Sequence, residues 1–555
     1  MPRHVTLAVC TGAALALTAC GTTEPEQPAE PPAPPATSQP APEPSPTPSP
    51  TQTEDEDEAL AEYGISAGHP LAVEAGAQIL AEGGSAADAI VASAFAVAVV
   101  EPFASGIGGG GAAIVVPGDE QAIAYDYREE VPASGSIPPG GAGVPGFVAG
   151  MAQIHAEHGR LDWSQVLQPA IDLASDGFEV SPFLALRMDS DYGPEAVGGL
   201  DHFTSSGTPL DAGEVLVQED LAATMTTLAQ DGPDAYYGGP LAQGVAAVQG
   251  LDRDSLAGYE VLTAEPVRGE VGEYQILAAP PALPGVALIQ MLQVAEAGGL
   301  AQAEPGSAEY MELLGEGWAV GYDTTVTELG DPRFVDVPVA ELTDPDANAA
   351  LARTGATTSG PVSTSEPGPA GAGNTTHLTA VDTDGLMISM TNTITSFWGS
   401  QQYVDGYFLN NQLTRFEAIG TTGANEPQAG RRSVSWSLPA VVTDQQDRPV
   451  LGIGTPGADR IPQVMAQVIS RWGLHGQGLE EAVAAPRFAY EDGQIAVESE
   501  PAGEVAADLS VPYEVIPPEW AYFGSVQALQ VDWDSGQVSG APDDRREADV
   551  AIGEP

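Results

Sequence analysis

The chain contains no lysine, so all 17 of its basic residues are arginines. Against them stand 78 Asp and Glu residues, which gives a formal net charge of −61 at pH 7. A surface of this charge repels phosphate backbones and anionic lipid headgroups, because both are bound through basic patches. The composition therefore excludes nucleic acid as a partner. It favours a strongly hydrated protein in surroundings where salt screens the self-repulsion.

Cysteine is almost absent: Cys10 and Cys20 are the only two, and both lie in an N-terminal targeting segment. Arg3 supplies its positive start and residues 5–19 its apolar stretch, which is too short for an ordinary spanning helix. The following "LTAC" resembles a bacterial lipobox, in which Cys20 is lipidated and becomes the mature N-terminus. The alternative is a plain secretory signal with a chance cysteine. If Cys10 leaves with the signal and Cys20 carries the lipid, the mature chain has no free thiol and no disulfide, which excludes cysteine catalysis and Cys-based metal sites.

From these features we expect a signal peptide over residues 1–19 and an exported lipoprotein anchored to the bacterial cell surface through the lipid on Cys20 alone. Residues 20–60 are dominated by Pro, Glu, Ser and Thr without apolar periodicity. Such a segment cannot bury enough surface to offset its ordering entropy, so it is predicted to be a disordered tether. The globular part is predicted to begin at residue 61.

Helical and strand patterns mix along the globular part, which predicts a layered body of helices and sheets. Residues 69–102 predict two Ala-rich helices separated at Gly83–Gly84. Residues 340–374 are rich in Asp, Ala, Gly, Pro, Ser and Thr, which is typical of an exposed linker. This linker would separate residues 61–374 from residues 375–555, which begin with the strand-like "THLTAVDTDGLMISMTNT".

Motifs for metal or nucleotide chemistry are missing: we find no H-E-x-x-H and no P-loop. The seven histidines show no metal-ligand spacing, so no metal and no cofactor are expected. Thr375 directly follows the linker. If the Asn374–Thr375 bond is cleaved, the free α-amino group, with a pKa near 7.7–8.0, becomes a general base for the threonine's own hydroxyl. The alternative is that Thr375 and Thr376 simply start a strand, for which threonine is well suited.

The chain also carries a set of longer motifs: "HPLAVEAGAQILAEGGSAADA", "VVEPFASGIGGGG", "YDYREEVPA", "GPDAYYGG", "NTTHLTAVDTDG", "LNNQLTRF" and "GTPGADRI". Together they resemble the γ-glutamyltransferase (glutathione hydrolase) family of N-terminal-nucleophile hydrolases. The resemblance implies an α+β fold, a four-layer αββα sandwich formed by two autocleaved chains. It implies cleavage between Asn374 and Thr375 of an inactive precursor, whose large and small chains then stay associated as a heterodimer.

The same resemblance implies roles for individual residues. Thr375 would be the nucleophile, with Thr393 as its hydrogen-bonding threonine and Gly457 and Ala458 as the oxyanion-hole pair. Arg128 would hold the α-carboxylate of the substrate, and its alternative is a structural ion pair. Gln412 and Ser435 would line the substrate pocket.

Three positions depart from the family pattern. Arg415 stands where an acidic residue reads the α-ammonium of the glutamyl donor, Trp436 replaces the second serine of a Ser-Ser pair, and Thr395 replaces an asparagine. A guanidinium repels an ammonium group and attracts a carboxylate. The half of the pocket that binds the ammonium group in the family is therefore predicted to differ in this chain, unless these differences reflect drift or local misalignment.

Three hypotheses follow. The leading one is an enzyme that hydrolyses or transfers γ-glutamyl groups from small glutathione-type or γ-linked glutamyl donors. The second is a glutaryl or cephalosporin-type acylase on the same fold, acting on acyl amides. The third is a surface binding lipoprotein that has lost turnover.

Overall fold

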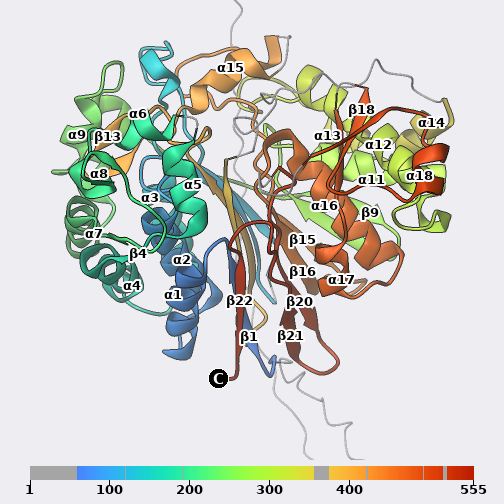
Figure 1. The fold of residues 1–555 in the computed structure, drawn as a ribbon, viewed down its shortest axis with the longest axis horizontal. Helices are drawn as coiled ribbons and strands as arrows, with labels where there is room; N and C mark the ends of the chain where they lie inside the picture. Colours follow the sequence, from blue (N-terminus) through green and yellow to red (C-terminus); the bar gives the residue numbers. More distant parts are fainter. Residues whose placement is uncertain are drawn as a thin grey trace, which may run out of the picture. The chain divides into compact units, whose positions relative to one another are not determined.

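Two antiparallel β-sheets form the centre of the computed structural model (Figure 1). The structure describes residues 59–118, 120–190, 192–354, 374–419, 423–491, 493–516 and 522–555, which belong to one unit spanning residues 57–555. The expected signal peptide, Cys20 and most of the expected tether lie outside the described residues. Leu60 is buried and donates its backbone N–H to the Thr383 carbonyl at 2.7 Å, so the folded body begins just before residue 61.

The first sheet has seven strands in the order β22 (Asp549–Gly553), β1 (Tyr63–Ala67), β11 (Thr376–Val381), β12 (Met387–Thr393), β2 (Gly110–Val116), β3 (Ile123–Asp126) and β8 (Leu262–Ala264). The second has six strands in the order β21 (Gln537–Gly540), β20 (Gln527–Asp532), β16 (Pro449–Gly454), β15 (Ala440–Thr443), β10 (Tyr274–Ala278) and β9 (Val267–Val271). The two sheets pack against each other, with β11 and β12 next to β16 and β20.

Strand β2 shows why the first sheet is covered on both faces. Successive strand residues point to opposite faces, and every residue of β2 is buried. Ala113 and Val115 belong to the core beneath the helices, whereas Ala112 and Ile114 belong to the core shared with the second sheet. Small and β-branched residues at both sets of positions therefore allow layers to pack on each side.

Helices cover the outer face of each sheet (Figure 1). On the side of the seven-stranded sheet lie α1 (Pro70–Ala81), α2 (Ala86–Val100), α3 (Phe147–His158), α4 (Trp163–Asp176), α5 (Pro182–Asp189), α6 (Gly193–Val197), α7 (Glu219–Asp231), α8 (Asp234–Tyr237), α9 (Ala242–Ala246) and α10 (Arg253–Ala257). On the other side lie α11 (Gly285–Gly298), α12 (Ala308–Thr327), α13 (Val339–Leu342), α14 (Pro345–Thr354), α16 (Ile461–Ile469), α17 (Leu479–Ala484) and α18 (Gly503–Asp508). This is the predicted αββα sandwich.

Shorter elements complete the body. The helix α15 (Arg415–Ala418) lies near the upper end of the view in Figure 1. Small sheets are formed by β4 (Phe178–Glu179) with β7 (Val215–Leu216), β5 (Thr204–Ser205) with β6 (Thr208–Pro209), β13 (Tyr403–Val404) with β14 (Tyr407–Phe408), and β17 (Phe488–Glu491), β18 (Gln494–Val497) and β19 (Tyr513–Val515) together.

The prediction of two helices separated at Gly83–Gly84 is confirmed by α1 and α2. Gly83 has φ +88°, a backbone conformation that favours glycine and turns the chain after α1. Ser85 then begins α2 with a capping box: its hydroxyl accepts from the Asp88 N–H at 3.2 Å, and Asp88 accepts from the Ser85 N–H at 2.9 Å.

The linker prediction was wrong for its first part. Helices α13 and α14 occupy much of residues 339–354, and Asp344 caps α14 by accepting from the Ala347 N–H at 2.8 Å. Residues 355–373 lie outside the described residues. Both sheets contain strands from each side of the Asn374–Thr375 bond, so the parts before and after it form one layered body. In the first sheet, β11 pairs with β1 on one side and β12 on the other.

Candidate active site

Thr375 lies immediately before β11, at the end of the seven-stranded sheet. Thr375 is buried, with 4% of the residue exposed. The hydroxyl group contacts the carbonyl oxygen of Asn374 and lies 3.4 Å from the Thr393 hydroxyl oxygen. The hydroxyl therefore stands beside the bond that the sequence predicts to be cleaved.

The backbone around this bond is held on both sides. The side-chain amide of Asn374 donates to the Phe103 carbonyl at 2.8 Å and to the Ser396 carbonyl at 2.5 Å. On the other side, Nη1 of Arg546 donates to the Thr375 carbonyl at 3.2 Å. These contacts fix the direction from which the Thr375 hydroxyl approaches.

A chain of hydrogen bonds leads away from the two threonines. Thr393 accepts from the Thr395 N–H at 2.8 Å, and the Thr395 hydroxyl donates to Oε1 of Gln412 at 2.5 Å. The Gln412 amide in turn donates to the Ser433 hydroxyl at 2.9 Å. Thr395 has φ +84°, which is unfavourable for a β-branched residue, so the surrounding bonds hold it in a strained conformation.

A small cavity brings together most of the residues that the sequence singled out. Its lining consists of Asn374, Thr375, Thr393, Thr395, Gln412, Arg415, Ser435, Trp436, Ser437, Ala458 and Ile461. Gly457 immediately precedes Ala458 in the loop between β16 and α16, but neither Gly457 nor Arg128 is among the lining residues. Ser437 and Ile461 were not anticipated, although both directly follow motif residues.

Arg415 is half-buried and faces this cavity from the start of α15. Burial lowers the pKa of its guanidinium, and the Asp459 carboxylate acts in the opposite direction. Among the described residues, no hydrogen bond or ion pair engages this guanidinium. The N–H donors of the Arg415 guanidinium are therefore available to bind an anionic group in the cavity.

Ala458 lines the same cavity, and Gly457 directly precedes it in the chain. Both residues have positive φ angles, +144° and +54°, and Ala458 begins a short 3₁₀ turn. Within the described part of the chain, neither N–H group has an acceptor. Two adjacent N–H groups without acceptors beside a hydroxyl nucleophile can stabilise a developing oxyanion.

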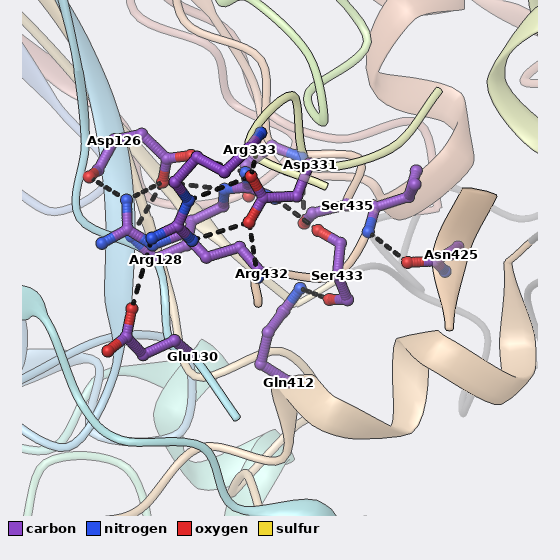
Figure 2. A network of polar contacts seen from close by, with 12 residues as sticks. Asp126, Arg128, Glu130, Asp331, Arg333, Gln412, Asn425, Arg432, Ser433 and Ser435 are labelled. Atoms are coloured by element: carbon purple, nitrogen blue, oxygen red, sulfur yellow. Dashed lines mark hydrogen bonds and ion pairs between the residues drawn. The ribbon is translucent and has the colours of Figure 1, made fainter. Parts of the chain in front are cut away.

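The Arg128 guanidinium forms its contacts with other groups of the protein (Figure 2). Its guanidinium donates to both carboxylate oxygens of Asp126, at 3.0 and 2.6 Å, and to the Ser433 carbonyl at 2.6 Å. Burial acts to raise the pKa of Asp126, but the Arg128 and Arg432 charges outweigh it and hold that pKa well below its usual value. These contacts are those of a structural ion pair, the alternative that the sequence left open for Arg128. Arg128 is connected to Gln412 through Ser433, which both residues contact.

The polar network of Figure 2 joins residues that precede the Asn374–Thr375 bond in the sequence to residues that follow it. Arg432 pairs with Asp126 at 3.3 Å, and its backbone N–H donates to Asp331 at 2.9 Å. Asp331 also accepts from Arg333 at 2.6 Å. Asp126 and Asp331 precede the bond and Arg432 follows it, so the network ties the two parts together.

Ser435 and Trp436 sit at the inner wall. The Ser435 hydroxyl accepts from the Ser437 N–H at 3.5 Å. The Trp436 indole turns into the core, where it stacks on Tyr322 with ring centroids 6.0 Å apart and lies 5.8 Å from Trp318. A large aromatic side chain gains most by this burial, so Trp436 shapes the wall by filling the core behind it.

Two absences complete the description. The described residues contain no cluster of three or more His, Cys, Asp or Glu side chains arranged to hold a metal ion. Among the same residues, no helix has the length and apolar character needed to cross a membrane.

Comparisons with known proteins place this site in a family. Residues 72–553 match the gamma-glutamyltranspeptidase family. The chain is 36% identical over 491 residues to the capsule biosynthesis protein CapD proenzyme of Bacillus anthracis, covering 87% of this chain and 89% of that protein. It is 32% identical to the glutathione hydrolase proenzyme of Bacillus subtilis (88% and 91% covered) and 33% identical to the acylase ACY 1 proenzyme of a Pseudomonas strain (78% and 83% covered).

Among solved structures, the cephalosporin acylase from Bacillus halodurans shares the fold, with a TM-score of 0.80 at 24% identity over 92% of this chain and 98% of that one. The family match covers most of the chain, and the relatives are enzymes named as proenzymes. The chain therefore belongs to the gamma-glutamyltranspeptidase family and is an enzyme of the N-terminal-nucleophile hydrolase type.

Proposed function

We propose that this protein cleaves itself between Asn374 and Thr375 and then hydrolyses or transfers γ-glutamyl-type acyl groups through an ester on Thr375. The observation that carries the proposal is the position of the Thr375 hydroxyl, which contacts the Asn374 carbonyl at the edge of the cavity. The relatives named glutathione hydrolase proenzyme support both the precursor and the reaction class.

Self-cleavage begins with attack of the Thr375 oxygen on the carbonyl carbon of Asn374. The C–N bond breaks, the nitrogen takes up a proton, and an ester joins Asn374 to the Thr375 oxygen. Water then hydrolyses the ester, leaving a carboxylate on Asn374 and a free α-amino group on Thr375. Thr393 accepts from Thr395 and is thereby oriented toward the attacking oxygen, 3.4 Å away.

In turnover, the free amine removes the proton from the Thr375 hydroxyl as the oxygen attacks the amide carbonyl of the donor. The N–H groups of Gly457 and Ala458 stabilise the oxyanion. The proton passes to the departing amine, and the acyl group remains on Thr375 as an ester. Attack by water completes hydrolysis, and attack by an acceptor amine completes transfer.

The donor we propose carries a carboxylate, and not a free ammonium group, where Arg415 faces the cavity. A γ-linked glutamyl chain with an acylated amine fits this requirement, as does a dicarboxylic acyl amide. Thr395, Gln412 and Ser435 would contact the same end of the donor, with Arg128 connected to Gln412 through Ser433. Glutathione itself, which has a free α-ammonium group, would be a poor donor because Arg415 repels it.

Three anilides test this choice: γ-glutamyl anilide, N-acyl-γ-glutamyl anilide and glutaryl anilide. The two donors without an ammonium group should have at least tenfold higher kcat/KM, and Arg415→Asp should reverse the order. Arg253→Asp, which makes the same charge change on an exposed helix, should not. If γ-glutamyl anilide is the best donor of the wild type, the proposed role of Arg415 is wrong.

The acylase hypothesis is the second candidate, because the acylase ACY 1 proenzyme is 33% identical to the chain. A strong preference for glutaryl over N-acyl-γ-glutamyl anilide would favour it. The binding-protein hypothesis, of a processed or unprocessed chain that has lost turnover, predicts no activity on any of the three anilides.

We also propose that the enzyme is exported and held at the cell surface by a lipid on Cys20. The support is the "LTAC" sequence after the apolar stretch and the Pro/Glu-rich segment that follows it. The wild type should partition into detergent and Cys20→Ser should not. Detergent partitioning of Cys20→Ser would contradict the anchor.

A further inference from the structure

A buried charged pair lies close to Thr375 that the proposed reaction does not use. Arg546, just before β22, has 8% of its surface exposed and donates through Nη1 to the Thr375 carbonyl at 3.2 Å. Glu101, just after α2, has 2% exposed, and its Oε2 has no hydrogen-bond partner in the described structure. Buried charges are costly unless they compensate one another, so this pair requires an explanation.

The two groups act on each other electrostatically. Burial raises the pKa of Glu101 to about 7, although the Arg546 charge opposes this. Burial lowers the pKa of Arg546 to about 10, and Glu101 opposes that change. Arg546 thus remains a cation at neutral pH, and the ionised form of Glu101 stabilises that cation.

Glu101 also reaches the residue after the nucleophile. The Thr376 hydroxyl oxygen and Oε2 of Glu101 both lie close to the backbone of Gly68. A Cβ atom added to Gly68 would be 3.0 Å from the first and 3.3 Å from the second. Thr376 and Thr375 are adjacent at a strand start, where side chains alternate between faces. The pair therefore supports the nucleophile from the face of the sheet opposite the cavity.

Cleavage makes this support more important. Once the Asn374–Thr375 bond is broken, the contacts of Asn374 no longer restrain Thr375. Thr375 is then joined to the rest of its chain only through Thr376, the first residue of β11. A chain terminus frays unless further contacts hold it in place. The Arg546 bond to the Thr375 carbonyl does not depend on Asn374, so it still holds the residue that carries the new amine and hydroxyl.

We propose that Arg546, stabilised by Glu101, is a positioning residue that fixes the Thr375 backbone so that its amine and hydroxyl meet the donor in reacting geometry. This inference rests on the proposed role of Thr375. Neither residue touches the cavity, so loss of the pair should lower the rate of the chemical step and leave substrate binding unchanged.

The experiment measures kcat and KM of the best anilide donor for purified, processed wild type and variants. Arg546→Gln should lower kcat at least tenfold with KM within twofold, and Arg546→Lys, which keeps the charge and a donor, should recover part of the loss. Glu101→Gln should lower kcat by a smaller factor, because the Arg546 bond survives without its charge partner.

Matched controls separate positioning from general packing. Arg187 is equally buried and lies over the same Phe183 ring as Arg546, at 5.1 and 5.3 Å. Glu129 is a buried carboxyl group whose oxygens have no hydrogen-bond partners in the described structure. Arg187→Gln and Glu129→Gln should keep kcat within about twofold of the wild type when their melting temperatures match those of the test variants.

The outcomes are distinct. Suppose that the wild type is cleaved at Thr375. If Arg546→Gln then keeps its kcat, or if both its kcat and its KM change, the positioning role is overturned and the proposed function stands. The same holds if Arg187→Gln loses as much kcat as Arg546→Gln. If Thr375→Ala retains turnover, the proposed function fails and the positioning role fails with it. Should Arg546→Gln not fold, Arg546→Lys and Glu101→Gln carry the same comparison.

Discussion

At the scale of single residues, two positions beside Thr375 adopt backbone conformations that side chains usually avoid. Ala458 has φ +54° and Thr395 has φ +84°. Such strain clusters at functional sites and costs on the order of 1–3 kcal/mol per residue. Ala458 lines the cavity with Thr375, and at Thr395 the strained backbone points the N–H at Thr393. The arrangement of donors is therefore maintained against the local preference of the chain.

Replacing Ala458 by glycine tests this reading. Relief of the left-handed strain, about 1 kcal/mol, is partly offset by the greater entropy of unfolded glycine, so the free energy of unfolding should stay equal or rise by up to about 1 kcal/mol. Because the N–H is retained, kcat/KM should stay within about twofold. Denaturant unfolding of Ala458→Gly is compared with Ala223→Gly in the exposed face of α7, which should lose about 1 kcal/mol. Equal losses at both positions would contradict strain at Ala458.

Motifs located much of the site, because Thr375, Thr393, Gln412 and Ala458 lie in local patterns that can be read from the sequence. Arg546 could not be located in this way. Its contact with Thr375 joins residues 171 positions apart, and its neighbour Arg545 looks equivalent in sequence. A structural ion pair was the alternative role that the sequence left open for Arg128, but only the folded structure shows that its partner is Asp126, through both carboxylate oxygens.

At the scale of secondary structure elements, apolar patterns predicted α1 and α2 because their Ala-rich faces and the Gly83–Gly84 break are strong local signals. Helix α14 was missed because Asp, Asn, Ala and Pro also dominate linkers. Its sequence nevertheless contains Pro345 in the first turn, a capping Asp344, and Ala, Leu and Arg, which favour helices. The linker prediction was based on the residue composition of the segment and did not take these helix signals into account.

Strand β11 carries a buried histidine that makes stability depend on pH. His377 lies between the sheets, bonded through Nδ1 to the Thr391 hydroxyl at 2.8 Å, and burial lowers its pKa to about 3. Between pH 6.5 and 3 the unfolded chain binds a proton at this residue that the folded chain does not. Its contribution to stability is therefore complete above pH 6.5 and is lost as the pH falls.

The melting temperature of the wild type should fall between pH 7 and pH 5 by more than that of His377→Gln. The variant starts from a lower melting temperature at pH 7 because a buried bond is altered, so the comparison is between the two changes with pH. Equal changes for both proteins would show that His377 does not contribute to the pH dependence.

At the scale of the whole molecule, charge is distributed unevenly. Arg128, Arg432, Arg460, Arg487 and Arg546 are buried, where they pair with carboxylates or backbone carbonyls. The excess of acidic residues, which gives the net charge of −61, lies mostly at the surface. Mutual repulsion among exposed carboxylates favours expansion of the chain, and salt screens it over a Debye length of about 10 Å at 0.1 M.

Raising NaCl from 0.1 to 1 M should therefore increase the melting temperature by several degrees, measured by thermal unfolding at pH 7. Sucrose at equal osmolality serves as the control for nonspecific exclusion from the surface. A melting temperature that is unchanged or lower in 1 M NaCl would mean that repulsion does not limit stability.

The central claim is that Thr375 cleaves the chain and becomes its N-terminal nucleophile. Both sheets take strands from each side of that bond, so the two products should remain together after cleavage. Intact-mass measurement and N-terminal sequencing of the purified protein test the claim most directly. The wild type and Thr376→Ala should each yield two co-purifying chains, the smaller one beginning at residue 375, and Thr375→Ala should stay whole. An uncleaved wild type after long incubation, or cleavage of Thr375→Ala at the same bond, would contradict it.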